Sequence, residues 1–159
     1  MKHSELYRRM AAKTDPTNPE RYLPLRFHNR DTALVIQFLV QNWLPESIIE
    51  ETGLSKTEMT RLAVFLGMVH DLGKLSTAFI FQLFPRCPQL REWLKSLTIV
   101  EPKRKERDFK HHTLIGAAIL SEMGAPDWVV SVVGAHHGKP LPGNFDPSTV
   151  MKAERNLFG

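Results

Sequence analysis

Apolar residues recur at helical spacing through much of the chain, and these stretches give the predicted elements. From about residue 30 to residue 43 the apolar positions suit a buried helix, which Pro45 ends because proline cannot continue a helix. A second helix, with Thr57 as its predicted N-cap, has a broad apolar face that runs into His70 and Asp71. The second helix thus leads from buried positions directly to two chemically active side chains.

The second half of the chain predicts shorter helices, bounded by proline and glycine. These are 78–84, which Pro85 and Pro88 break, then 89–97, then 109–123 with Asp108 as N-cap and a stop at Gly124 and Pro126, then 127–135, and a helical start at 148–156. Periodicity leaves 127–135 open between a strand and a buried helix, and Pro126 at a helix N1 position favours the helix. Residues 15–24 predict an irregular lead-in and 101–110 a charged connector. No segment is assigned as a strand, so the predicted fold class is all-α.

The composition limits the function only weakly. The 159 residues suit one domain, 1–159, with an N-terminal lead-in at 1–24. The formal net charge of +4 favours polyanionic partners such as nucleic acid. Cys87 is the only cysteine, which excludes an intramolecular disulfide and a cysteine-rich zinc site. A polar N-terminus and the lack of an apolar run of membrane-spanning length predict a cytoplasmic protein with no membrane partner.

Histidine carries the chemical signal of this sequence. Six of the seven histidines fall in four short places beside apolar segments: His28, His70, the pair His111 and His112, and the pair His136 and His137. Three of these places alone are more often structural than ligand sites, and the pair His136 and His137 alone is as often a chance pair at the start of a loop. Together with an aspartate they are poorly explained by accident, because imidazole nitrogens and carboxylate oxygens are ligands for divalent metals. The pattern predicts one joint metal site.

The string His70-Asp71-Leu72-Gly73-Lys74 is the centre of this prediction. Adjacent helical residues point about 100° apart, so His70 and Asp71 share a metal only near a helix end or if the carboxylate bridges two ions. Lys74 lies four residues after His70 and can share its face, where it could neutralise a phosphate oxygen. For a lysine alone, a solvated surface position is the commoner outcome.

Two further places have supporting neighbours. His136 and His137 end an apolar segment, and Gly138 removes a side chain where backbone or substrate comes close. His28 has Asp31 three residues further on, a spacing that lets a carboxylate accept the second N–H of the imidazole and orient it.

These residues resemble the HD superfamily of metal-dependent phosphohydrolases, and within it the HD nuclease domain of the CRISPR-associated nuclease-helicases of type I systems. The resemblance covers about residues 20–140 in the family's order. It is carried by the strings PLRFHNRDTA (24–33), FLGMVHDLGK (65–74) with Phe79 downstream, KHHTLIGAAIL (110–120) and VGAHHG (133–138). HDxGK is shared by many HD branches, whereas the PLxxHxxD opening and the HHG close narrow the choice.

The resemblance implies an HD-domain helical bundle with a central site for two divalent ions. The ions are expected to be transition metals (Fe, Mn, Ni or Co), with Mg as an alternative. The implied ligands are His28 and His70 on one ion, His112, His136 and His137 on the other, and Asp71 as a bridge between them.

The choice of His112 over His111 also rests on the resemblance. The family's histidine is followed four and five residues later by small side chains, here Gly116 and Ala117. His111 then takes the place of a basic residue and, like Asp31, is expected to support the ligands from outside the metal site.

The resemblance implies cleavage of single-stranded DNA in CRISPR interference, an antiviral defence, with both endonuclease and exonuclease action. Two ions would activate water and stabilise the attacking and leaving oxygens, with Asp71 and Lys74 as the catalytic side chains. Implied partners are single-stranded DNA, a helicase domain or subunit, and the CRISPR RNA-guided surveillance complex. Basic residues of the charged connector are expected to guide the strand, although a solvated loop is as common: Lys103, Arg104, Lys105, Arg107 and Lys110.

One feature of the family is not found. The family has a further metal-binding aspartate on a helix well after HHG, whereas the acids after His137 are only Asp146 and Glu154. Asp146 lies in a proline-rich loop and is not assigned that role. Either the domain is truncated at its C-terminal end, or the first metal site has one ligand fewer. Helicase motifs such as a phosphate-binding Gly-rich loop are also missing from the sequence.

Two other functions stay open. HD phosphodiesterases acting on cyclic dinucleotides or nucleotides also have HDxGK followed by paired histidines, but with an acid after the pair and a Gly-Tyr-Pro string, neither of which occurs here. An inactive HD module that binds nucleic acid or a partner protein is the alternative of another class, and the missing aspartate motivates it.

Overall fold

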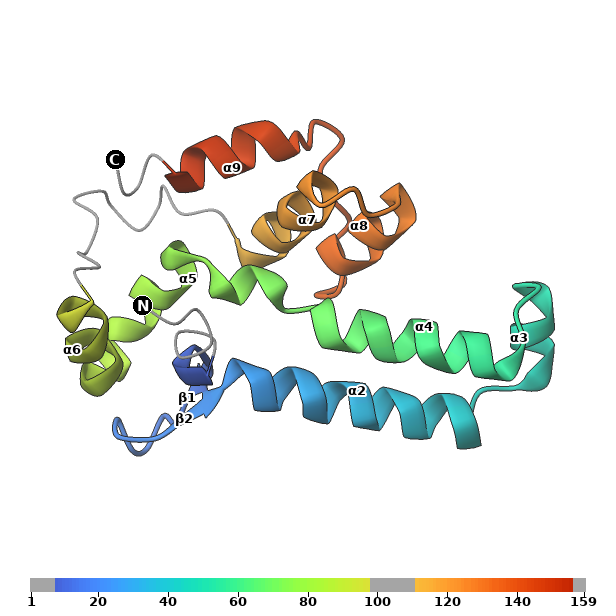
Figure 1. Cartoon of the computed structure of the whole chain (residues 1–159), viewed down its shortest axis with the longest axis horizontal. Helices are drawn as coiled ribbons and strands as arrows, with labels where there is room; N and C mark the ends of the chain where they lie inside the picture. The colour runs from blue at the N-terminus through green and yellow to red at the C-terminus, as the bar shows by residue number, and fades with distance from the viewer. Residues whose placement is uncertain (1–7, 98–110, 156–159) are drawn as a thin grey trace.

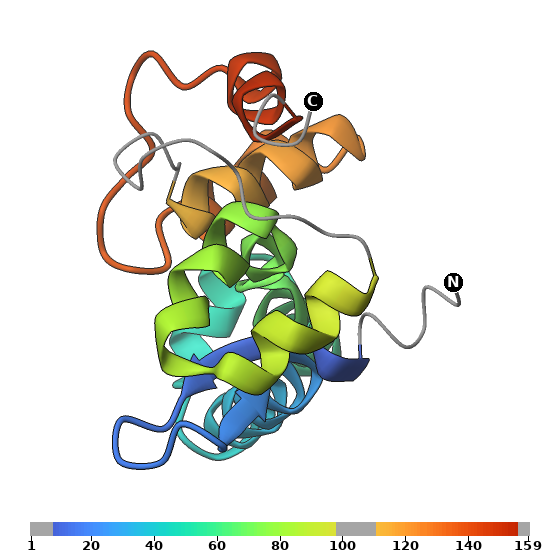
Figure 2. The same ribbon diagram turned by 90° about the vertical axis from the view of Figure 1, so that its left-hand side faces the viewer.

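The computed structural model describes residues 8–97 and 111–155, which are all-α apart from one two-stranded sheet. The elements are β1 (Ala11–Thr14), β2 (Tyr22–Pro24), α2 (Leu25–Asn42), α3 (Glu46–Glu51), α4 (Lys56–Val69), the 3₁₀ helix η1 (Leu72–Leu75), α5 (Thr77–Leu83), the 3₁₀ helix η2 (Phe84–Arg86), α6 (Pro88–Ser96), α7 (His112–Glu122), α8 (Asp127–Gly134) and α9 (Pro147–Arg155). They stack in tiers, with α4 and α5 between α2 on one side and α7, α8 and α9 on the other (Figures 1 and 2). The predicted fold class is confirmed.

Helices α2 and α4 form a long antiparallel hairpin joined through α3 (Figure 1). A Cβ atom at Gly67 of α4 would lie 2.9 Å from Cδ1 of Ile36 and 3.0 Å from Cα of Ala33, so the two helices touch almost backbone to backbone. Because the helices are antiparallel, the start of α2 lies beside the end of α4. The rings of His28 and His70 consequently meet, with centroids 5.2 Å apart.

The small sheet corrects the expectation that 15–24 is wholly irregular and that the chain has no strand. β1 and β2 pair antiparallel, with Ala11 opposite Pro24. The turn between them is closed by the Asp15 carboxylate, which accepts hydrogen bonds from the backbone N–H and the hydroxyl of Thr17. Alanine and proline have low strand propensity, and the strands form because the core buries them: Ala11 is fully buried.

Two helix starts differ from the predicted ones. α2 begins at Leu25 instead of near residue 30, so His28 lies in its first turn and not before the helix. α4 is capped by Ser55 and not by Thr57. The Ser55 side chain accepts from the backbone N–H of Glu58, and the Glu58 carboxylate accepts from the Ser55 N–H, which makes a capping box.

The other helices follow the prediction closely, with one addition. α3, which was not predicted, starts directly after Pro45, and Pro88 begins α6 as well as ending the segment before it. α8 resolves the ambiguity at 127–135 in favour of a helix. The predicted N-cap Asp108 lies outside the described residues.

Buried apolar side chains form three clusters around these helices. One joins the sheet to α5, η2 and α6, and includes Met10, Leu25, Phe84, Cys87, Leu90 and Leu94. The other two surround α7: Ala78, Ile115, Ala118 and Val150 in one, and Ala117, Leu120, Val129, Val130 and Val133 in the other. Leu75 of η1 packs against the first of these clusters and Leu72 against the third, so packing on two sides holds η1 against α7.

Within the described ranges, no single helix combines the length and the apolar character needed to cross a membrane. One pair, Lys56–Leu75 with Ala78–Arg86, meets the requirement by length and composition, and its two parts are bent by 74°.

Candidate metal centre

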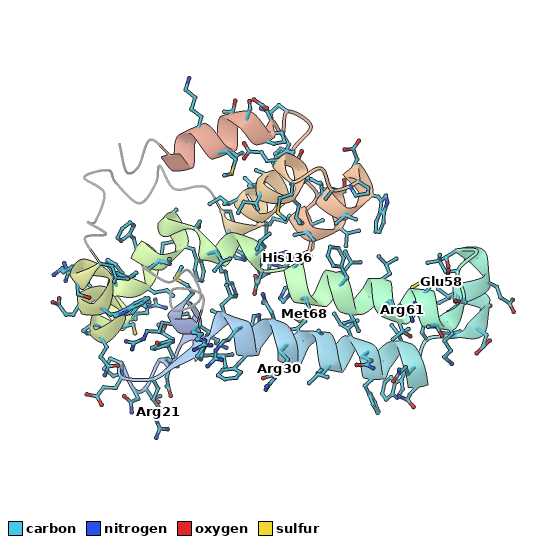
Figure 3. All side chains as sticks on the ribbon, viewed as in Figure 1. Arg21, Arg30, Glu58, Arg61, Met68 and His136 are labelled. Carbon is cyan, nitrogen blue, oxygen red and sulfur yellow. The ribbon has the colours of Figure 1, made fainter. Side chains whose placement is uncertain are left out.

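The predicted histidines converge on Asp71 from four separate parts of the chain. His28 lies in the first turn of α2, and His70 is the C-cap of α4. Asp71 follows as the N-cap of η1. His112 is the first residue of α7, and His136 and His137 follow the end of α8. Figure 3 shows His136 where the end of α8 meets α4 and η1.

The carboxylate of Asp71 is the hub of this cluster and is only 2% exposed. Oδ2 lies 2.7 Å from Nε2 of His28, 3.2 Å from Nε2 of His70 and 2.7 Å from Nζ of Lys74; Oδ1 lies 3.3 Å from Nε2 of both His112 and His136. Burial raises the pKa of Asp71, but the imidazoles of His112, His136 and His70 and the ammonium of Lys74 outweigh it and hold the pKa far below its usual value. Asp71 is therefore an ionised carboxylate surrounded by nitrogen atoms.

Backbone hydrogen bonds fix the orientation of two of the rings. Nδ1 of His70 lies 2.8 Å from the carbonyl oxygen of Gly67, and Nδ1 of His136 lies 2.6 Å from that of Val133. A carbonyl can only accept, so Nδ1 carries a proton in each ring, and Nε2 donates to Asp71 only in the charged imidazolium; in the neutral ring the lone pair of Nε2 faces the carboxylate, as that of a metal ligand would. This is the usual way in which a protein orients a metal-ligating histidine.

The donor atoms fit a cation. Oδ1 of Asp71 and Nε2 of His136 are buried and have no hydrogen-bond partner, although they lie 3.3 Å apart. A lone pair facing a carboxylate is repulsive unless a proton or a metal ion lies between them, and buried polar atoms without partners are costly. These unsatisfied atoms are what a divalent ion would bind.

The ligand atoms divide into two groups that share Asp71. One contains His28, His70 and Asp71; the other contains Asp71, His112, His136 and His137. Within each group the ligand atoms lie within 4.8 Å of one another. In the second group, Nε2 of His112 and Nε2 of His137 are 3.0 Å apart. The same division was predicted for the two ions, and both groups could hold a metal.

Lys74 belongs to the centre, although not through the predicted helical face. α4 ends at Val69, and Lys74 lies in η1, from which its Nζ reaches Oδ2 of Asp71 at 2.7 Å. Its side chain is 13% exposed, so it is not a solvated surface lysine. Its ammonium also lies 5.4 Å from the ring centre of Phe79, which in turn contacts the ring of His112.

One of the two predicted supporting residues, Asp31, lies away from the ligands, and the other, His111, lies beside them. The carboxylate of Asp31 is exposed and pairs with Arg30 at 3.1 Å, so the structure does not bring it to His28. His111 caps α7 by accepting a hydrogen bond from the amide of Thr113, with its ring centre 4.3 Å from that of His112.

Asp146, which was not assigned a metal role, caps α9 by accepting hydrogen bonds from the backbone amides of Ser148 and Thr149. The basic residues Lys103, Arg104, Lys105, Arg107 and Lys110 lie outside the described residues.

Glycine positions the ligands, and the prediction missed this role. A Cβ atom at Gly73 would overlap the carbonyl oxygen of His112 and lie 2.6 Å from the amide nitrogen of Gly116. η1 and α7 therefore meet backbone to backbone, which sets His112 against Asp71. The pairing of two glycines far apart in the sequence gives no periodic signal that a sequence pattern could reveal.

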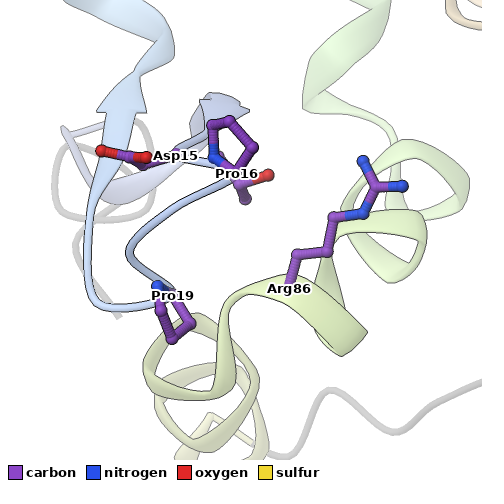
Figure 4. Close-up of a pocket in the computed structure, with 5 residues that line it drawn as sticks. Asp15, Pro16, Pro19 and Arg86 are labelled. Carbon is purple, nitrogen blue, oxygen red and sulfur yellow. The ribbon is translucent and has the colours of Figure 1, made fainter.

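A separate pocket of about 570 Å³ lies at the turn of the β-hairpin (Figure 4). Its lining combines the acidic Asp15 and the basic Arg86 with two prolines, Pro16 and Pro19. None of the candidate metal ligands lines it, so it is distinct from the centre around Asp71.

Comparison with known proteins agrees with this geometry. The family model described as "Cas3, HD domain" matches residues 12–156. The CRISPR-associated nuclease/helicase Cas3 of Streptococcus thermophilus is 31% identical over 161 residues, which cover 89% of this chain but 17% of that relative. No solved structure matches. Because the family model covers nearly all of the chain, the protein belongs to the Cas3 HD-domain family.

Proposed function

We propose that this chain is a metal-dependent nuclease domain that hydrolyses phosphodiester bonds of single-stranded DNA in CRISPR interference. One observation carries the proposal: the imidazoles of His28, His70, His112 and His136 converge on one buried carboxylate, that of Asp71. Membership of the Cas3 HD family and the similarity to a protein named a nuclease/helicase support it.

The two ligand groups would hold two divalent ions, with Asp71 shared between them. When bound, such ions supply an activated water and stabilise the charge on the attacking and leaving oxygens of a phosphodiester. The chain's own contribution is placement: the carbonyls of Gly67 and Val133 hold His70 and His136 with Nε2 toward Asp71. His137 is exposed, so substrate can approach this side of the centre.

Nitrogen donors outnumber carboxylates in both groups, which bears on the identity of the ions. Imidazole suits iron, nickel and related transition metals, whereas magnesium prefers oxygen ligands and dehydrates reluctantly. Of the ions that the resemblance implies, Fe, Ni and Co fit this donor set best, whereas Mn and Mg both prefer oxygen ligands.

Lys74 would act on the phosphate. Its ammonium already lies within the centre, 2.7 Å from Oδ2 of Asp71. A cation fixed beside the site of reaction stabilises negative charge that develops on a phosphoryl group, and costs no reorganisation at that moment. Lys74 needs only a shift of its flexible end to contact a phosphate oxygen.

The relative's name also includes a helicase, and we propose that this helicase lies outside the region that the relative shares with this chain. The chain spans 17% of the relative's length, and the match covers the HD domain alone. We propose that a helicase, on the same polypeptide or another subunit, and the CRISPR RNA-guided complex deliver single-stranded DNA to this centre in the cytoplasm.

The proposal is tested by incubating the chain with linear and circular single-stranded DNA and Mn²⁺, Ni²⁺ or Co²⁺. Cleavage of the circle would demonstrate endonuclease action, and shortening of the linear strand from its ends exonuclease action. Activity must disappear with EDTA and in Asp71→Ala. Metal content without cleavage of DNA, but with hydrolysis of cyclic dinucleotides, would favour the other phosphodiesterase class. A chain that binds no metal would favour an inactive HD module that binds nucleic acid or a partner protein.

A further inference from the structure

A pocket of about 390 Å³ opens beside the metal centre. It is formed by the start of α7 and the segment that follows α8, and its lining includes His111, Leu114, Gly134, His137, Lys139 and Pro140. His137 belongs both to this pocket and to one of the two ligand groups. A molecule in the pocket would therefore touch the metal centre directly.

The polar side of the pocket suits an anion. The amide of Thr113 donates to Nδ1 of His111, so the neutral ring of His111 carries its proton on Nε2 and can donate it to a ligand. Lys139 adds an exposed ammonium. Among the residues described as lining the pocket there is no carboxylate.

The opposite side of the pocket is apolar. Leu114 of α7 and Pro140 line it, and Gly134 at the end of α8 packs closely against the side chain of Leu141, which a Cβ atom at residue 134 would overlap. A volume of this size is within the range of about 300–1,000 Å³ that small-molecule sites occupy. A pocket with donors on one side and an apolar wall on the other matches a nucleotide, which has an anionic phosphate and a flat base on a sugar.

We propose that this pocket binds the nucleotide adjacent to the scissile phosphate, with Lys139 and His111 contacting its phosphate and Leu114 and Pro140 contacting its sugar or base. This inference rests on the proposed function, since it names a subsite for the nuclease substrate. Lys139 and His111 are then substrate-positioning residues, and neither is needed to hold metal.

The test measures binding of a short fluorescent oligo(dT) by anisotropy, in EDTA so that no cleavage occurs, over a series of KCl concentrations. Lys139→Ala is compared with Lys95→Ala, an exposed lysine of α6 that carries the same charge. Loss of one charge-assisted phosphate contact should weaken binding about tenfold. It should also reduce the slope of log affinity against log salt by about 0.7. Lys139→Arg should restore both values.

Equal affinity and slope for Lys139→Ala and Lys95→Ala would overturn the subsite. Thymidine monophosphate and inorganic phosphate, added as competitors, separate the ligand sources: the subsite requires the nucleotide to compete more strongly than phosphate. Equal competition by both would reduce the pocket to a simple phosphate site and contradict the proposal. These binding measurements need no catalysis. Weaker binding by Lys139→Ala, together with no cleavage of DNA by the unaltered chain with Mn²⁺, would therefore support the nucleotide pocket and refute the nuclease function.

Discussion

Gly73 and His112 meet with no room for a side chain between them, since a Cβ atom on residue 73 would overlap the carbonyl oxygen of residue 112. This contact joins η1, which carries Lys74, to the first turn of α7, which carries a predicted metal ligand. The separation of His112 from Asp71 is therefore set by backbone packing and not by the flexible side chains alone.

Gly73→Ala should destabilise the chain by about 1–3 kcal/mol or more, because η1 and α7 must move apart to admit the methyl group. It should also weaken metal binding, since His112 moves with α7. Urea unfolding and metal analysis would measure the two effects. Gly143→Ala is the matched control, because nothing lies within 4 Å of a Cβ atom there. An equally small loss of stability in both variants would contradict this packing.

Ser55→Ala should lower the free energy of unfolding by about 1 kcal/mol, because it removes the N-cap of α4 and one half of the capping box. Thr57, which the sequence suggested as the cap, is exposed in the first turn, so Thr57→Ala should change stability by no more than about 0.5 kcal/mol. Urea unfolding of the two variants decides between the caps: a larger loss for Thr57→Ala would show that the sequence-based assignment was right.

Ser55 and Thr57 illustrate which parts of the fold could be predicted from the sequence. Stretches with strong periodicity and a proline or glycine at the boundary, such as those of α5 and α8, were predicted nearly to the residue. The start of α4 was not, because Thr57 was chosen as the cap although Ser55, with Glu58 three residues further on, has the spacing of a capping box in the sequence itself. The sheet was missed because burial, and not strand propensity, holds its alanines in place.

In the metal centre, the candidate ligands could be predicted from the sequence, whereas the groups that orient their rings could not. The clustered histidines predicted one joint metal site, and the resemblance to the HD superfamily supplied the expected ligand set. Asp31 has the right spacing to orient His28, but Arg30 lies next to it and takes its carboxylate. The backbone carbonyls of Gly67 and Val133 orient His70 and His136 instead, and a backbone contact leaves no signature in the sequence.

Lys74→Ala should reduce kcat for single-stranded DNA by about 10²–10³-fold, as expected when one preorganised charge is removed from a transition state. Metal affinity should stay the same or rise, since a cation 2.7 Å from Oδ2 of Asp71 repels divalent ions. Kinetics with Mn²⁺ and metal analysis on one preparation check both outcomes. Loss of metal together with activity would instead make Lys74 a structural partner of Asp71.

Added Mn²⁺ should stabilise the folded chain, because the ligands come from distant segments and meet only when it is folded. At a free concentration of 100 times Kd the gain is about 2.7 kcal/mol for one site. Thermal unfolding with and without EDTA would show it. In Asp71→Asn the gain should vanish, and an undiminished gain in that variant would place the bound metal elsewhere.

The number of ions bound per chain tests the central claim most directly. After equilibrium dialysis against Mn²⁺ and elemental analysis, we expect two ions per chain in the unaltered protein, one in His28→Ala, which disables only the group of His28, His70 and Asp71, and none in Asp71→Asn. Two ions retained in Asp71→Asn, or none in the unaltered protein, would contradict a metal centre built on the shared carboxylate.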